Sequence, residues 1–470
     1  MVLELLLGTG AGYGLATWAL GRRDPELRWD WSGYDPQDLT WTRRFPKDFL
    51  WGVATAAHQI EGGLDDNNWS RWETQTGPDG KPRIHNGERA GLACDHWRRF
   101  REDIQLMVDL GVQSYRLSLE WSRIEPSPGV YDGEAIARYH ELLDAVIAAG
   151  LQPMITLHHF THPLWFEDLG SFEKEENLVH IVRFTERMFQ EYGRKARHWC
   201  TLNEPEVFAS QGWFSGVFPP GKKDPQLTAV VLCNLLRAHG RMYRAIKALP
   251  GGHDVEVGLV KDIFQFEPDR RWHLGDVAVA RVLDEVMNEC ILTTLQSGHF
   301  RLQIPGMISL DASAVEAAGT LDFVGLNYYS HYHTRFRPHP AEPFVFRPQP
   351  GDTMTDMPYP IYPEGLYRAL VRLAKIGAPI IITENGIADA ADTRRDDFIR
   401  RYLYAVSKAI EDGVDVRGFY YWSLLDNFEW AEGWQMKFGL YAMDPVTRAR
   451  TLREGSKVYP EIIRRSRAHE

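Results

Sequence analysis

The sequence predicts a single (β/α)8 barrel, an α/β fold in which eight parallel strands alternate with helices. Beyond about residue 40, short apolar segments alternate with longer amphipathic ones, which is the pattern of repeated strand–helix units. Eight of the apolar segments have the length of strands. Polar and aromatic residues gather where these segments end, as they do at the mouth of a barrel.

The eight expected strands are, in chain order, 49–57, 114–121, 151–159, 196–204, 256–264, 321–329, 379–385 and 416–424. Between the second and third, segment 134–149 carries apolar residues at helical spacing and stops at Gly150. Segments 235–249 and 396–411 show the same helical pattern. The alternation by itself also fits an open, doubly wound sheet, but eight strands with intervening helices favour closure.

No flexible linker or internal repeat divides the chain, so we expect one barrel domain over residues 41–470 after an N-terminal extension over residues 1–40. The proline-rich segment 331–363 is too long for a plain connection between two elements. We therefore expect it to be a loop that shapes the entrance of the site.

The N-terminal run 5–20 carries no charge and is followed by Arg22 and Arg23. It lacks the positive start of a signal peptide, and it is short and glycine-rich for a membrane span. Two interpretations stay open: membrane association through residues 1–21, or a locally packed N-terminus. Because arginines that follow an inserted segment stay on the cytoplasmic side, we expect a cytoplasmic domain with or without a membrane contact.

Charge and cysteine content exclude several classes of protein. The net charge of −11 argues against nucleic acid as a partner, since phosphate binding needs massed positive charge. Four scattered cysteines without a C-x-x-C pair predict buried, reduced thiols. The histidines of the run 158–162 suggest a metal site at first sight. However, successive strand residues point to opposite sides, and no acidic or cysteine side chain lies at ligand spacing from these histidines. We expect no metal and no cofactor.

Two glutamates carry the prediction of chemistry. Glu204 ends the fourth expected strand, Glu384 lies near the end of the seventh, and these strands face each other across a barrel mouth. Glycoside cleavage requires such a pair, because one carboxyl group donates a proton to the leaving oxygen while the other attacks or assists at the anomeric carbon.

The sequence resembles glycoside hydrolase family 1, the family of many β-glucosidases. The resemblance covers residues 45–460 and rests on ordered motifs that include Asn203-Glu204-Pro205 and Thr383-Glu384-Asn385-Gly386. The remaining motifs are segments 49–62, 115–124, 323–329 and 422–430.

The resemblance implies a retaining β-glycosidase, most simply a β-glucosidase, that hydrolyses terminal non-reducing β-D-hexosides through a covalent glycosyl-enzyme. Glu204 would be the general acid/base and Glu384 the nucleophile, flanked by Arg116 and Tyr328. The other residues expected to bind the sugar are Gln59, His159, Asn203, Trp422, Glu429 and Trp430. The Trp422–Ser423 peptide is expected to be cis.

Other activities stay open. An uncharged N-terminus and an apolar acceptor groove would favour a membrane-associated transglycosylase or a glycolipid β-glycosidase. A sugar-binding receptor without turnover would use the same barrel. The motifs do not distinguish gluco- from galacto- or fuco-configured sugars, nor do they identify the aglycone, and the oligomeric state stays undetermined by sequence.

Overall fold

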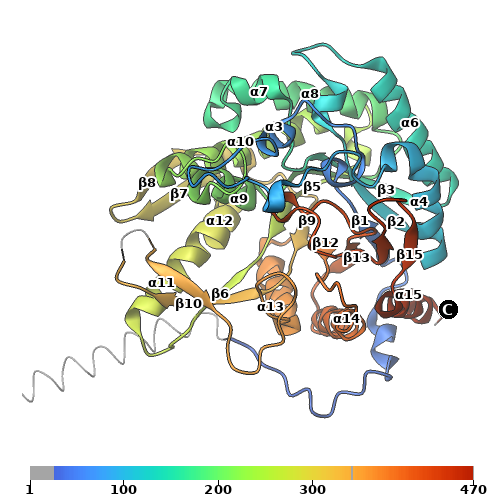
Figure 1. The fold of residues 1–470 in the computed structure, drawn as a ribbon, viewed down its shortest axis with the longest axis vertical. Helices are drawn as coiled ribbons and strands as arrows, with labels where there is room; N and C mark the ends of the chain where they lie inside the picture. Colours follow the sequence, from blue (N-terminus) through green and yellow to red (C-terminus); the bar gives the residue numbers. More distant parts are fainter. Residues whose placement is uncertain (1–25, 340–341, 469–470) are drawn as a thin grey trace, which may run out of the picture.

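Eight parallel strands form a closed barrel in the computed structural model, which describes residues 26–339 and 342–468. The strand order around the barrel is β1-β13-β12-β9-β5-β4-β3-β2, with helices around it (Figure 1). The strands are β1 (Leu50–Ala54), β2 (Ser114–Ser118), β3 (Gln152–His158), β4 (His198–Asn203), β5 (Glu256–Asp262), β9 (Phe323–Asn327), β12 (Ile380–Asn385) and β13 (Val416–Trp422).

Each barrel strand lies inside the segment predicted for it, so the closed barrel is confirmed and the open sheet is excluded. Their side chains are almost all buried on both faces, which explains the continuous apolar character of the segments. The polar residues at their carboxyl ends therefore converge on one mouth.

Two of the long outer helices begin at an aspartate whose side chain accepts from free backbone N–H groups. Asp132 accepts hydrogen bonds from the backbone N–H groups of Glu134 and Ala135 at the start of α6, and Asp224 accepts one from Leu227 at the start of α10. The long outer helices are α4 (His96–Leu110), α6 (Gly133–Ala148), α8 (Leu178–Tyr192), α10 (Pro225–Ala248), α13 (Pro363–Leu373), α14 (Arg395–Glu411) and α15 (Val458–Arg467). Helix α10 begins well before the expected residue 235. Its first half was not recognised in the sequence because it is buried on several sides and lacks a clear amphipathic period.

Short helices and a small hairpin lie in the connections around the barrel. The short helices are α2 (Ala57–Ile60), α3 (Asn68–Trp72), α5 (Trp121–Ile124), α7 (Leu164–Asp168) and α9 (Pro205–Ala209). A small hairpin joins β14 (Tyr441–Met443) to β15 (Arg450–Leu452). The four cysteines are buried and unpaired, as predicted.

A large insertion separates β5 from β9. It contains β6 (Gln265–Pro268), α11 (Leu274–Asp284), α12 (Cys290–Ser297) and the hairpin of β7 (His299–Ile304) and β8 (Ile308–Ser313). Segment 331–363, which follows β9, was expected to be an irregular loop. That prediction is wrong, because the segment contains β10 (His331–Phe336) and β11 (Phe344–Arg347). Strand β10 pairs with β6 and β11 in a separate sheet beside the barrel (Figure 1). The prolines that suggested a loop lie around these strands.

The N-terminal extension packs along the outside of the barrel from residue 26 onward. The Tyr362 hydroxyl donates to the Leu27 carbonyl oxygen at 2.7 Å, and Glu364 accepts from the Trp29 backbone N–H at 2.9 Å. Residues 1–21, for which membrane association was predicted, lie outside the described residues. Within 26–339 and 342–468, none of the helices has the length and apolar character needed to cross a bilayer.

Candidate active site

The two glutamates line one cavity of about 650 Å³ at the carboxyl ends of the strands. Glu384 is the second-last residue of strand β12, and Glu204 directly follows β4. Their exposed fractions are 3% and 7%, so both carboxyl groups are removed from bulk water. A buried carboxyl group in a cavity needs a specific partner, and the two groups have different ones.

The backbone at Glu204 adopts a conformation that L-residues seldom use. Its φ is 44° and its ψ is 65°, which is the left-handed region, and Pro205 then begins helix α9. Holding a non-glycine residue there costs about 1–3 kcal/mol. The turn directs the Glu204 side chain into the cavity, where Asn327 Nδ2 donates to Glu204 Oε1 at 2.5 Å.

Arg116 and Tyr329 donate to the two carboxylate oxygens of Glu384. Arg116 Nη1 lies 2.6 Å from Glu384 Oε1, and the Tyr329 hydroxyl donates to Glu384 Oε2 at 2.7 Å. Arg116 is itself 1% exposed and also donates to Asn203 Oδ1 at 2.6 Å. A fixed guanidinium and a phenol hydroxyl stabilise the ionised form of the carboxyl group.

These partners separate the two pKa values. Burial raises the pKa of Glu204 well above its usual range, and the charge of Glu384 raises it further. Burial also raises the pKa of Glu384, but Arg116, the Tyr329 hydroxyl and Asn327 oppose that rise. Of the two groups, Glu384 is therefore the one that ionises first, while Glu204 keeps its proton to higher pH.

The predicted contact of the Tyr328 hydroxyl with the Glu384 carboxylate is wrong, and the Tyr329 hydroxyl takes that place. The Tyr328 hydroxyl donates to the Tyr362 carbonyl oxygen at 3.0 Å, and the side chain packs closely against Gly365, away from the carboxylates. Successive residues at a strand end point to opposite sides. Asn327 points into the barrel, so Tyr328 points outward and Tyr329 points inward again.

Several predicted sugar-binding residues present buried polar atoms with no hydrogen-bond partner among the described residues. These atoms are Gln59 Oε1, His159 Nδ1 and Asn203 Nδ2. His159 and Asn203 line the cavity, and Gln59 donates to Glu429 Oε2 at 3.2 Å. Burial lowers the pKa of His159 well below its usual value, so its imidazole is neutral. Unpartnered buried polar atoms are rare, and hydroxyl groups of a ligand would satisfy them.

Trp422, Glu429 and Trp430 lie together on the same cavity wall. The ring centroids of His159 and Trp430 are 6.0 Å apart in a stacked arrangement, and those of His159 and Trp422 are 5.9 Å apart. Burial raises the pKa of Glu429 to about 8, with a further contribution from the charge of Glu384. The Trp422–Ser423 peptide is cis, which confirms the prediction.

Three residues of this region were not identified from the sequence. Asn327 and Tyr329 fall inside segment 323–329, which was recognised only as a motif. Asn327 lies near the end of a predicted strand, and side-chain alternation counted from Asn327 would have placed Tyr329 on the same side. Asp262, at the end of β5, lines the cavity and has Oδ1 without a partner among the described residues. Its position at a strand end was the available signal.

Two walls of different character enclose the cavity. The barrel wall consists of residues at the strand ends and in the loop after β13: His159, Asn203, Glu204, Tyr329, Glu384, Trp422, Glu429 and Trp430. The insertion wall is mainly apolar and comes from segments 264–308 and 332–359; it includes Phe264, Phe266, Val282, Met307, Tyr332, Phe336, Phe344 and Phe346. The segment expected to shape the entrance thus contributes to this wall.

Comparisons with known proteins agree with this geometry. The family described as glycosyl hydrolase family 1 matches residues 41–468. Beta-glucosidase A of Thermotoga maritima is 33% identical over 447 residues, covering 90% of this chain and 98% of the relative. A beta-glycosidase structure from Pyrococcus horikoshii is 37% identical with a TM-score of 0.80, covering 91% of this chain and 95% of that one. The Thermotoga maritima beta-glucosidase in complex with glucoimidazole is 30% identical with a TM-score of 0.83, covering 90% and 99%.

Proposed function

The chain belongs to glycosyl hydrolase family 1, and from this premise we propose that it is a retaining β-glucosidase with Glu384 as nucleophile and Glu204 as general acid/base. The observation that carries the proposal is the unequal environment of two carboxyl groups in one cavity. Arg116 and Tyr329 favour the ionised form of Glu384, whereas burial favours the protonated form of Glu204. Retaining cleavage needs this division of protonation states.

In the first half of the reaction, a Glu384 carboxylate oxygen attacks the anomeric carbon and the bond to the leaving oxygen breaks. Glu204 gives its proton to that oxygen, so the aglycone leaves as a neutral alcohol. The product is a glycosyl ester of Glu384 with inverted configuration.

In the second half, the negative charge of Glu384 is absent because the carboxylate is esterified. The pKa of Glu204 then falls, since one cause of its elevation is that charge. Glu204 therefore accepts a proton from water as the water attacks the anomeric carbon. The second inversion restores the β configuration and frees Glu384.

A glucose-type sugar is supported by the arrangement of polar atoms on the barrel wall. Gln59, His159, Asn203 and Glu429 offer donors and acceptors around the two carboxyl groups. The Thermotoga maritima relative has been solved with glucoimidazole and also with galacto-hydroximolactam. We therefore expect gluco-configured substrates to be cleaved and galacto-configured ones to be accepted as well.

Hydrolysis of 4-nitrophenyl β-D-glucoside followed by proton NMR tests the proposal. The first sugar to accumulate is expected to be β-D-glucose, and the α anomer should appear only later by mutarotation. Matched galacto- and fuco-configured substrates measure the preference for the sugar. Early α-glucose would overturn the retaining mechanism, and no turnover of any of these glycosides would favour a receptor.

The insertion wall favours a second, narrower function: cleavage of β-glycosides whose aglycone is a long alkyl or lipid alcohol. Val282, Met307, Phe336 and Phe346 of this wall line the cavity, and each side chain is between 38% and 43% exposed. Large apolar side chains at this exposure bind apolar ligand surface when they face one cavity. Each methylene group buried against such a wall contributes about 0.8 kcal/mol.

A series of alkyl β-glucosides from methyl to octyl tests this narrower function. If the chain lies along the insertion wall, kcat/KM should rise about fourfold per methylene group until the wall is covered, in line with about 0.8 kcal/mol each. A flat series would exclude the lipid aglycone and leave the β-glucosidase proposal intact. Adding a long-chain alcohol as acceptor, with the products followed by NMR, separates transglycosylation from hydrolysis.

A further inference from the structure

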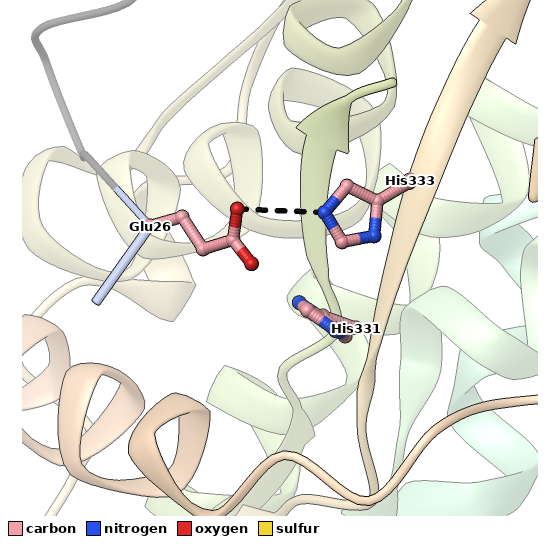
Figure 2. A group of neighbouring side chains, drawn as sticks. All are labelled: Glu26, His331 and His333. Atoms are coloured by element: carbon pink, nitrogen blue, oxygen red, sulfur yellow. Dashed lines mark hydrogen bonds and ion pairs between the residues drawn. The ribbon is translucent and has the colours of Figure 1, made fainter. Parts of the chain in front are cut away.

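Three side chains outside the catalytic cavity meet where the N-terminal extension crosses strand β10. His331 and His333 project from the same face of β10, and Glu26 approaches from the first described residues of the chain (Figure 2). One potential ligand atom from each lies within 4.8 Å of the other two. His333 Nε2 is 3.4 Å from Glu26 Oε2.

His331 is the unusual member of this group. It is fully buried, and neither ring nitrogen has a hydrogen-bond partner among the described residues. Leaving a buried polar atom unpaired costs about 1–3 kcal/mol. Tyr362 stacks on the ring with centroids 3.9 Å apart, which holds its orientation. Because neither nitrogen is engaged in a hydrogen bond with a described residue, the ring has a nitrogen lone pair available for a ligand.

Charged groups of both signs surround Glu26. Arg28 contacts Glu26 Oε1 and Arg271 contacts Glu26 Oε2, each at 2.7 Å. Each carboxylate oxygen has two lone pairs. Besides the Arg271 contact, the other contact of Oε2 among the described residues is the long one to His333 Nε2 at 3.4 Å, a second possible ligand. Asp352 lines the same hollow of about 340 Å³ and lies 3.5 Å from Arg28 Nη2.

We propose that Glu26, His331 and His333 bind a divalent transition-metal ion, with zinc as the best match. Two imidazoles and one carboxylate are typical zinc ligands, and a fourth position would face the hollow. Metal–ligand distances of about 2.0–2.1 Å place neighbouring ligand atoms about 3.3 Å apart in a tetrahedron, close to the observed separation of Glu26 and His333.

The role of this site is structural. The residues that line its hollow differ from those that line the catalytic cavity. Its ligands join the N-terminal extension to β10, and the neighbouring residue Tyr332 belongs to the insertion wall. Metal binding would therefore fix the extension to the element that supports this wall, independently of the glycosidase chemistry.

Titration of the full chain with Co²⁺, with Zn²⁺ competition, tests the proposal by visible absorption. One Co²⁺ per chain is expected, with the bands of tetrahedral coordination, displaced by one equivalent of Zn²⁺. His331→Phe preserves the stacking on Tyr362 and should weaken binding at least about tenfold, as loss of a ligand does. His299→Phe is the matched control, because His299 is an exposed histidine paired with Asp311 at 3.0 Å.

Glu26→Gln provides a second variant that leaves strand β10 unaltered and should also weaken Co²⁺ binding. Thermal unfolding of each variant establishes that it is folded. The proposal is overturned if the wild-type chain binds no stoichiometric Co²⁺ or Zn²⁺. It is equally overturned if folded His331→Phe and Glu26→Gln variants bind Co²⁺ as the wild type does.

Discussion

The barrel wall and the insertion wall of the cavity differ in composition, origin and expected role. The barrel wall consists of strand ends and the loop after β13, and it presents carboxylates, an amide and indoles. Among the described residues, its atoms His159 Nδ1 and Asn203 Nδ2 have no hydrogen-bond partner. The insertion wall presents mainly aromatic and aliphatic side chains, as in the stacked pair Tyr332 and Phe346, with ring centroids 4.1 Å apart. The difference indicates that the barrel determines the reaction, whereas the insertion determines which aglycone enters.

The largest expected effect comes from the barrel wall. Glu384→Gln keeps the size of the side chain but removes the attacking carboxylate, so kcat should fall by about four orders of magnitude or more on every glycoside. Steady-state assays with aryl and octyl β-glucosides measure the loss. Equal loss on both substrates supports a division of roles between the walls. Residual activity near that of the wild type would remove Glu384 from the mechanism.

Adjacent tyrosines provide a sharper test of the same wall. Tyr329→Phe removes the hydroxyl that donates to Glu384 at 2.7 Å, whereas Tyr328→Phe removes one that donates to a backbone carbonyl oxygen. A hydrogen bond to a charged group contributes about 1.5–3 kcal/mol, so kcat should fall about 10- to 100-fold in Tyr329→Phe. Tyr328→Phe is the matched control and should keep near wild-type kcat. A fall in kcat in Tyr328→Phe but not in Tyr329→Phe would instead make Tyr328 the tyrosine that supports Glu384.

A variant in the insertion wall should change substrate preference without changing the chemistry. Phe346→Ala shortens an apolar side chain that lines the cavity and is 40% exposed. The rise of kcat/KM with alkyl chain length should become shallower, with about a 3- to 10-fold loss for octyl β-glucoside and little change for methyl β-glucoside. Val446→Ala, an 87% exposed position, serves as the control. Loss of activity on both substrates would assign Phe346 to the reaction instead.

The smallest expected effect is on the pH dependence. Glu384 must be ionised and Glu204 protonated, so kcat/KM should fall at low pH as Glu384 gains a proton and at high pH as Glu204 loses one. In Tyr329→Phe the ionised Glu384 loses a donor, its pKa rises, and the acid limb moves to higher pH. A shift of the acid limb toward lower pH would contradict this assignment.

The barrel was accessible from the sequence because its signals are local. Each strand is a short apolar run buried on both faces; Glu204 directly follows such a strand, and Glu384 is the second-last residue of another. The error at Tyr328 arose where β9 ends, because one position along an extended segment reverses the direction of the side chain. Alternation counted from Asn327 would have given Tyr329.

The insertion wall was not accessible from the sequence. Apolar residues such as Val282 and Met307 have the same local pattern whether they pack into a core or face a cavity. Strands β10 and β11 lie in a proline-rich segment, and their pairing partner β6 is distant in the chain. The meeting of Glu26 with His333 joins residues 307 positions apart, which only the folded chain brings together.

The most direct test of the central claim is the configuration of the glycosyl azide formed when azide is added to two alanine variants. Glu384→Ala leaves a gap on the nucleophile side, so azide should attack an activated aryl β-glucoside directly and give the α-azide. Glu204→Ala should still form the glycosyl-enzyme, and azide should then give the β-azide. Proton NMR distinguishes the two products. The opposite pairing, or the same anomer from both variants, would contradict the assignment of Glu384 and Glu204.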